Sequence, residues 1–88
     1  MKRNTNRQKT KARDRAADAI KEYVSALNEA YPPARGRTRV VVKPDNRVIV
    51  NTPLPTRVRE RMRLFDQMAE VGTRLLIETD QHIILSGR

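Results

Sequence analysis

The chain has 88 residues, a formal net charge of +9 at pH 7, no cysteine and no tryptophan. This length predicts one domain, and without cysteine neither a disulfide framework nor a thiolate metal site can form. No apolar run approaches the length of a membrane span, and no hydrophobic stretch follows the basic N-terminus. We therefore expect a cytoplasmic protein with no signal peptide and no membrane partner.

The first eleven residues are predicted to form a disordered basic arm. Residues 1–15 contain seven lysines and arginines but a single acid, Asp14, so they carry six of the nine surplus charges. No apolar residue lies between Met1 and Ala12, so this segment cannot bury surface, and its cations favour phosphate groups. Residues 12–88 are then predicted to form a single α+β domain.

The junction between the arm and the domain favours helix. Ala12, Ala16 and Ala17 have high helix propensity, so the arm could become the first turns of a helix when it binds. In this respect, and in its arginine content, the arm resembles the arginine-rich peptides of phage antitermination proteins. The resemblance covers only the arm, and it implies folding of the arm on an RNA hairpin.

A first helix is predicted from about Thr10 or Lys11 to Tyr31. Apolar residues recur along one face at helical spacing: Ala16, Ile20, Tyr23, Leu27 and Ala30. Pro32 and Pro33 should end this helix, because a residue before proline is pushed out of helical geometry.

A β-hairpin is predicted next, with a three-residue turn at Pro44, Asp45 and Asn46. Three cross-strand pairs follow from this turn: Lys43 with Arg47, Val42 with Val48, and Val40 with Val50. The register places these four valines on one face. The opposite face then carries four cations and no acid: Arg37, Arg39, Lys43 and Arg47.

A second helix is predicted from Arg57 to Val71, capped by Thr56 and ended by Gly72. Its apolar residues form two adjacent strips: Val58, Met62, Phe65 and Ala69 in the first, and Leu64, Met68 and Val71 in the second. Together the strips cover about half of the helix circumference, more than packing on one sheet requires. Such a helix could contact both its own sheet and a partner chain.

A second hairpin is predicted from Arg74 to Ser86, turning near Asp80 and Gln81, because both arms are apolar at consecutive positions. Its last strand would expose an edge to another chain, so we expect a homodimer. The predicted fold is α+β, in the order helix-hairpin-helix-hairpin (αββαββ). Its sheet is antiparallel, with the helices packed on one face.

No group of residues indicates catalysis or metal binding. His82 is the only histidine, and the three glycines are isolated, so no nucleophile–base pair, metal cluster or phosphate-binding loop is evident. We therefore expect no enzyme, cofactor, metal or small-molecule substrate. The enzymatic alternative is a small basic ribonuclease in which His82 is the acid or base and Arg47 or Arg74 supports it.

The predicted function is binding of nucleic acid, either DNA or structured RNA, mainly through phosphates. Stacking on single-stranded bases is disfavoured because aromatic residues do not alternate with the cations. The expected contacts come from the arm, from the short connection at residues 34–37 that precedes the first hairpin, and from that hairpin: Lys2, Arg3, Arg7, Lys9, Lys11, Arg13, Arg35, Arg37, Arg39, Lys43 and Arg47. Of these, Arg39 and Arg47 are expected to reach deepest.

Three biological roles fit a protein with these features. A nucleic-acid-binding chain of this size could be a regulator. It could instead be a protein-interaction module, such as an inhibitor or accessory factor of a mobile element, that uses the strand edge and the apolar second helix. A structural component of a virion or ribonucleoprotein assembly is the third alternative, because a basic arm on a compact core suits that role.

Overall fold

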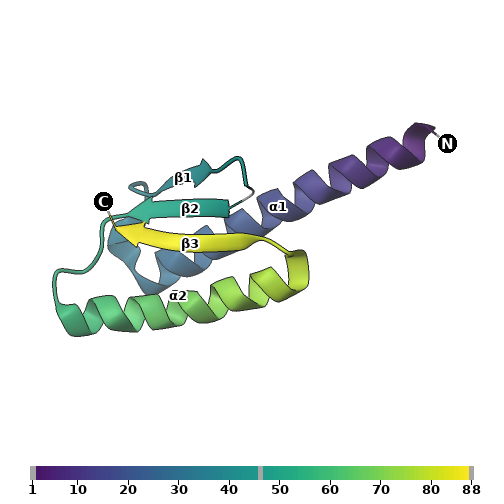
Figure 1. The fold of residues 1–88 in the computed structure, drawn as a ribbon. Coiled ribbons are helices and arrows are strands. Elements are labelled where there is room, and N and C mark those ends of the chain that lie inside the picture. Colours follow the sequence, from purple (N-terminus) through teal and green to yellow (C-terminus); the bar gives the residue numbers. More distant parts are fainter. Residues whose placement is uncertain (1, 46, 88) are drawn as a thin grey trace.

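The computed structural model describes residues 2–45 and 47–87, and it describes side chains from residue 16 onward. Within these ranges the elements follow in chain order (Figure 1): α1 (Lys2–Ala30), the 3-10 helix η1 (Pro32–Ala34), β1 (Arg39–Val42), β2 (Arg47–Thr52), α2 (Val58–Thr79) and β3 (His82–Gly87). The predicted α+β class is confirmed. The sheet is three-stranded and mixed, in the order β1-β2-β3.

The first helix ends where the prolines require. α1 stops at Ala30, and Pro32 and Pro33 enter η1 instead. The predicted arm, residues 1–11, falls on the part of the chain whose side chains lie outside the described residues. α1 itself begins at Lys2, earlier than the start at about Thr10 or Lys11 that the sequence predicts. The phosphate contacts of the arm and the domain boundary at residue 12 stay predictions.

The first hairpin has the predicted register. Val40 pairs with Val50 and Val42 with Val48 in the antiparallel β1–β2 ladder. The Lys43 N–H donates to the Arg47 carbonyl at 2.8 Å, which closes the turn next to the ladder. Alternating side chains together with a proline-containing turn thus fixed this pairing.

The second hairpin was wrongly predicted. α2 continues through Gly72 to Thr79, so residues 74–79 are helical, and β3 is a single strand that pairs in parallel with β2. A run of consecutive apolar residues is ambiguous between a buried strand and a helix, and here Leu75 is buried while Ile77 is exposed, as on a helix. Because α2 crosses between β2 and β3, the two strands run parallel and the sheet is not antiparallel.

The end of α2 is set by Asp80 rather than by Gly72. Asp80 has a left-handed backbone with φ of 59°, and its N–H donates to the Leu76 carbonyl at 2.9 Å. This geometry forms a C-terminal cap on the helix. Gly72 has no positive φ, so its role in α2 is close packing against β3 and α1.

Gly72→Ala is expected to raise the free energy of unfolding by about 0.5–1 kcal/mol, since glycine inside a helix is unfavourable relative to alanine. An added Cβ would lie 3.4 Å from the Ile83 carbonyl oxygen and 3.6 Å from Tyr23 Cε2, which are ordinary contacts. Urea unfolding should be measured at protein concentrations where the midpoint no longer changes with dilution. Gly36→Ala is the control: its φ of 72° should make that variant less stable. A loss of stability in Gly72→Ala would instead show that the added methyl group disturbs the packing of α2 against β3 and α1.

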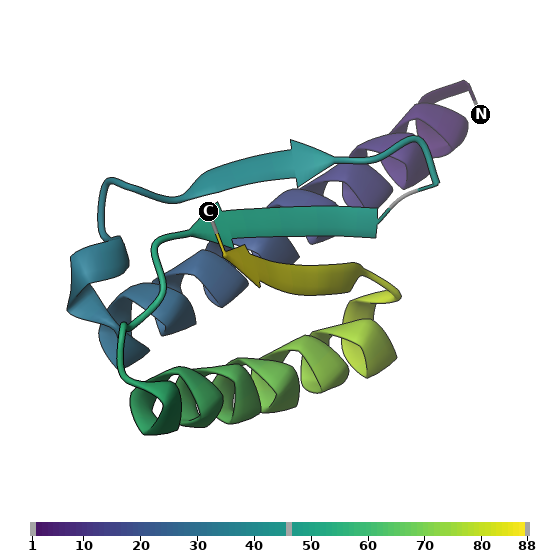
Figure 2. The same ribbon diagram turned by 60° about the vertical axis from the view of Figure 1, so that its left-hand side comes forward.

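The core lies between the helices and one face of the sheet (Figure 2). Its buried residues come from α1, α2, the sheet and η1: Ala19, Tyr23, Leu27, Leu64, Met68, Leu75, Val48, Val50, Ile83 and Ala34. Both helices supply core residues that pack with the same sheet face. The other sheet face is not covered by any element of the described chain. Among the described residues, no helix is both long enough and apolar enough to cross a bilayer.

Candidate nucleic-acid interface

The uncovered side of the sheet, which we call the open sheet face, is built by strand register. Its side chains form three rows across β1, β2 and β3: Arg39, Asn51 and Ser86; Val41, Ile49 and Ile84; and Lys43, Arg47 and His82. The middle row is aliphatic and half-buried, whereas the cations of the outer rows are exposed. The open sheet face is therefore an apolar strip with positive charge on both sides.

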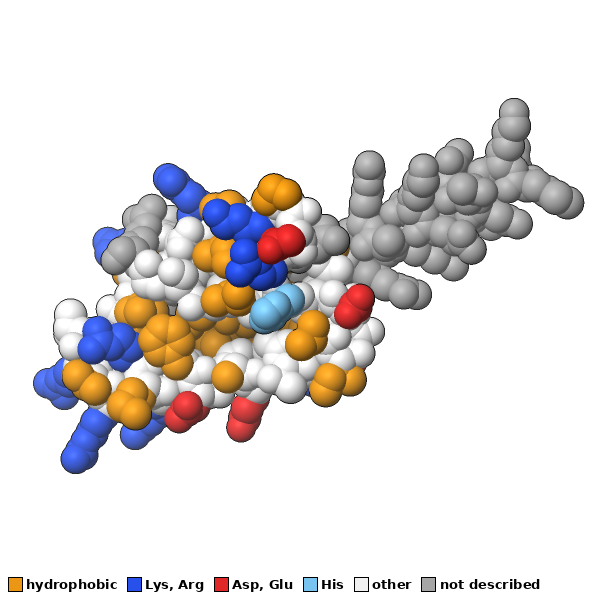
Figure 3. Space-filling view, in the orientation of Figure 1, with side chains coloured by type: hydrophobic (Ala, Val, Ile, Leu, Met, Phe, Trp, Pro, Cys, Tyr) orange, Lys and Arg blue, Asp and Glu red, His pale blue; other side chains and the backbone are white. Residues whose placement is uncertain are grey.

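Positive charge is concentrated toward the hairpin end of this face. Figure 3 shows lysine and arginine side chains gathered there beside the single histidine. Arg39 and Lys43 make no ion pair with any described residue. Neither charge is therefore neutralised by a described acid, and contact of these two cations with phosphate stays a prediction.

The prediction that this face carries no acid is wrong at Arg47, which forms an ion pair with Asp45. Its Nε lies 2.7 Å from Asp45 Oδ2, and its backbone N–H donates to Asp45 Oδ1 at 3.3 Å. Asp45 belongs to the turn and folds back toward β2, so this corner of the face contains a carboxylate. Both side chains are about half exposed, at 51% and 54%, so solvent screens the pair.

The pKa of Asp45 reflects these contacts. Desolvation acts to raise the pKa, but hydrogen bonds from the backbone and the guanidinium of Arg47, together with its positive charge, hold it below the ordinary value. The carboxylate therefore stays ionised at neutral pH and offsets part of the Arg47 charge. Arg47 is consequently a weaker candidate for phosphate contact than Arg39.

Arg35 and Arg37 lie in the connection before β1. Both are exposed, and no described acid pairs with either. The connection is held by the Ala34 carbonyl, which accepts from the Arg37 N–H at 3.0 Å and from the Thr38 hydroxyl at 2.9 Å. These two cations thus extend the positive surface beyond Arg39. The predicted contacts of the arm, from Lys2 to Arg13, have side chains outside the described residues.

Sequence reasoning did not place His82 in this site. It predicted a hairpin tip, whereas the parallel β2–β3 register makes His82 the partner of Arg47. The ribonuclease alternative named this same pair, and it stays untested. Arg74, its other suggested partner, pairs with Glu22 at 3.4 Å and Glu78 at 3.6 Å instead. Among the side chains that the structure describes, in residues 16–45 and 47–87, there is no cluster of three metal-binding groups.

Comparison with known proteins finds no match for this chain among protein-family models, curated proteins or solved structures.

Proposed function

We propose that the protein binds double-helical nucleic acid through the open sheet face and the N-terminal arm. The observation that carries this proposal is an uncovered sheet face with an aliphatic row between Arg39 and Lys43, two cations that pair with no described acid. Phosphates supply most of the affinity of such surfaces, and they fix orientation without reading sequence. The absence of aromatic residues from the three rows argues against stacking of single-stranded bases.

The spacing of the outer rows supports contact with a groove of duplex DNA. Arg39 begins β1 and Lys43 directly follows its last residue, so their Cα atoms are about 13 Å apart if the extended backbone rises about 3.3 Å per residue. The major groove of B-form DNA is about 12 Å wide. The cations could therefore reach phosphates on both sides of the groove while the Val41–Ile49–Ile84 row faces its interior. An RNA hairpin offers the same phosphate chemistry but a narrower major groove.

Opposite charge changes on this face should have opposite effects on binding. Arg39→Gln or Lys43→Gln should each weaken binding about threefold to tenfold and lower the salt slope by about 1, since each removes one phosphate contact. Asp45→Asn should strengthen binding several-fold because it frees the Arg47 guanidinium, and asparagine can keep the hydrogen bond to the Arg47 N–H. Fluorescence anisotropy at several salt concentrations, with duplex DNA and separately with an RNA hairpin, measures both quantities.

Arg74→Gln is the matched control, because Arg74 is also a half-exposed arginine but is paired with Glu22 and Glu78. Its affinity should equal that of the wild type within about twofold. The proposal fails if Arg74→Gln weakens binding as much as Arg39→Gln. It also fails if the wild-type chain binds neither ligand at low salt.

A further inference from the structure

Within the described part of the chain, one face of α2 carries apolar side chains that the fold leaves partly or largely exposed. Its members recur at alternating intervals of four and three residues: Val58, Met62, Phe65, Ala69, Gly72 and Leu76. We call this set the α2 stripe. Such spacing is typical of helices that pack along another helix. Val58 and Met62 are 58% and 60% exposed, and Phe65 and Leu76 are 37% and 40% exposed.

The stripe is distinct from the face that α2 uses in its own fold. The neighbouring strip of Leu64, Met68 and Leu75 is buried in the core, at 3% exposure or less. The fold therefore buries one of the two apolar strips of α2 in the core and leaves the other at the surface. Large exposed apolar patches on soluble proteins usually mark interaction sites.

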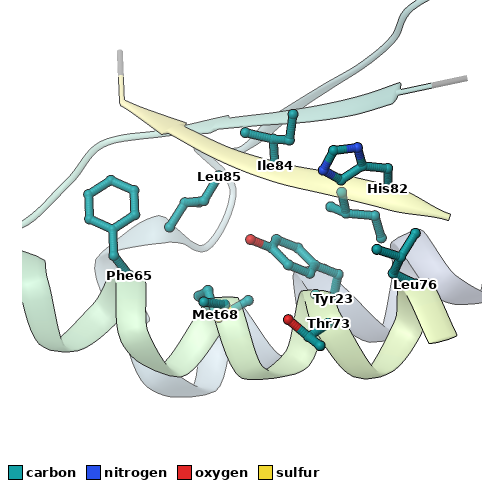
Figure 4. Close-up of a pocket in the computed structure, with 11 residues that line it drawn as sticks. Tyr23, Phe65, Met68, Thr73, Leu76, His82, Ile84 and Leu85 are labelled. Carbon is teal, nitrogen blue, oxygen red and sulfur yellow. The ribbon is translucent and has the colours of Figure 1, made fainter. Parts of the chain in front are cut away.

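The C-terminal part of the stripe, from Phe65 to Leu76, also lines one wall of a groove, shown in Figure 4. The groove has a volume of about 310 Å³, and its opposite wall is formed by four consecutive residues of β3, from His82 to Leu85. Because consecutive residues line it, the groove runs along the strand as well as along α2, and β3 is an edge of the sheet. Tyr23 lies behind this opening, with its ring between α2 and β3. An unprotected strand edge beside an apolar helix face is usually covered in a native assembly.

The distribution of charge along α2 indicates which partner packs on the stripe. The first turns are basic, with Arg57, Arg59, Arg61 and Arg63 against Glu60. The remainder is acidic, with Asp66, Glu70, Glu78 and Asp80 against Arg74. A second α2 placed antiparallel would set the basic end of each helix beside the acidic end of the other. A parallel arrangement would set like charges together.

We propose that a second copy of this chain packs its α2 antiparallel along the stripe, in a twofold-symmetric dimer. The contact is centred between Ala69 and Gly72; Ala69 is small and exposed, so two helices can approach closely there, whereas Gly72 faces β3 and α1 of its own chain. Phe65 and Leu76 lie symmetrically on either side of that centre, so each can pack against the other residue of the partner copy. The contact is isologous, and it leaves the cations of the open sheet face outside the helix interface.

Cross-linking tests the direction of the two helices, and the natural chain helps because it has no cysteine. Full-length Met62→Cys and Leu76→Cys chains should be prepared separately, mixed, and treated with a short bismaleimide. Antiparallel packing predicts at least about fivefold more cross-linked dimer in the mixture than in either chain alone. Equal or greater yield from the single variants would overturn the antiparallel arrangement. Ala17→Cys, at an exposed position on α1, is the control for random collision.

The second test uses the oligomeric state of the full chain. Sedimentation equilibrium should show a wild-type dimer and an increase of at least about tenfold in the dimer dissociation constant for Met62→Lys. Met62 is already exposed in the single chain, so this substitution does not disturb the core. Val42→Lys is the matched control, because Val42 is 61% exposed but lies on β1, and it should dimerise like the wild type. A monomeric wild type, or a Met62→Lys dimer as stable as the wild type, would refute the proposal.

Discussion

Replacing Lys2, Arg3, Arg7, Lys9 and Lys11 with glutamine is expected to weaken binding to duplex DNA by at least about a hundredfold at moderate salt. These five residues supply cations to a segment with no acid before Asp14. Each phosphate contact that they make releases a counterion, so the slope of log K against log salt should fall by about 4. Glutamine keeps helix propensity and chain length, so the change is one of charge. Anisotropy titrations over a range of salt concentrations measure the slope directly.

A charge-preserving variant separates attraction to phosphates from recognition by guanidinium groups. Arg3→Lys combined with Arg7→Lys keeps the charge of the arm but loses the planar donors of arginine. It should bind duplex DNA like the wild type and keep the same salt slope. A wild-type slope in the five-glutamine variant would show that the arm makes no phosphate contacts.

The stability of the protein is expected to fall by about 2–3 kcal/mol between pH 10 and pH 12 because of Tyr23. Burial raises the pKa of Tyr23 from 10.0 to about 12, and the side chain is only 1% exposed. Above pH 10 the unfolded chain loses the phenolic proton while the folded chain keeps it. Since the folded state then binds more protons, its free energy of unfolding decreases as pH rises to the folded pKa and does not decrease further on this account above it.

Urea unfolding at several values across this pH range tests the expectation with two variants. Tyr23→Phe keeps the buried ring but has no phenolic proton, so its stability should change less over the same range. Tyr31→Phe, at a half-buried position packed against the core, should keep the wild-type decrease. An equal decrease in Tyr23→Phe and the wild type would show that another group is responsible.

The first half of the fold was predictable because local rules determine it. The prolines after Tyr31 end α1, and the proline-containing turn at residues 44–46 fixes the register of β1 and β2. Alternation of valines and cations then assigns the two faces of the hairpin. The same alternation placed Arg39 and Lys43 on the open sheet face, together with Arg47.

The second half depended on tertiary structure that local patterns do not encode. The run Leu75–Leu76–Ile77 fits a strand or a helix equally well, and Gly72 resembles a helix end although it lies inside α2. Packing of Leu75 in the core decides for the helix. His82 reaches Arg47 only because α2 then crosses over and β3 pairs in parallel with β2.

The contact between Asp45 and Arg47 could have been predicted from the sequence. An aspartate in a turn commonly accepts from the backbone two residues later, and Asp45 does so with Arg47. The acid of the turn could therefore have been assigned to the cationic face in advance. Its consequence is that the strongest phosphate contact of the hairpin is expected from Arg39 rather than from Arg47.

The most direct test of nucleic-acid binding is an NMR titration of the full chain with a short DNA duplex at low salt. We predict that the largest chemical-shift changes map to the arm, to β1 and β2, and to the side chains of Arg39 and Lys43. Residues on the far side of α2, such as Glu70, should change little. Changes confined to α2, or no change at a stoichiometric excess of duplex, would contradict the proposal that the open sheet face binds a polyanion.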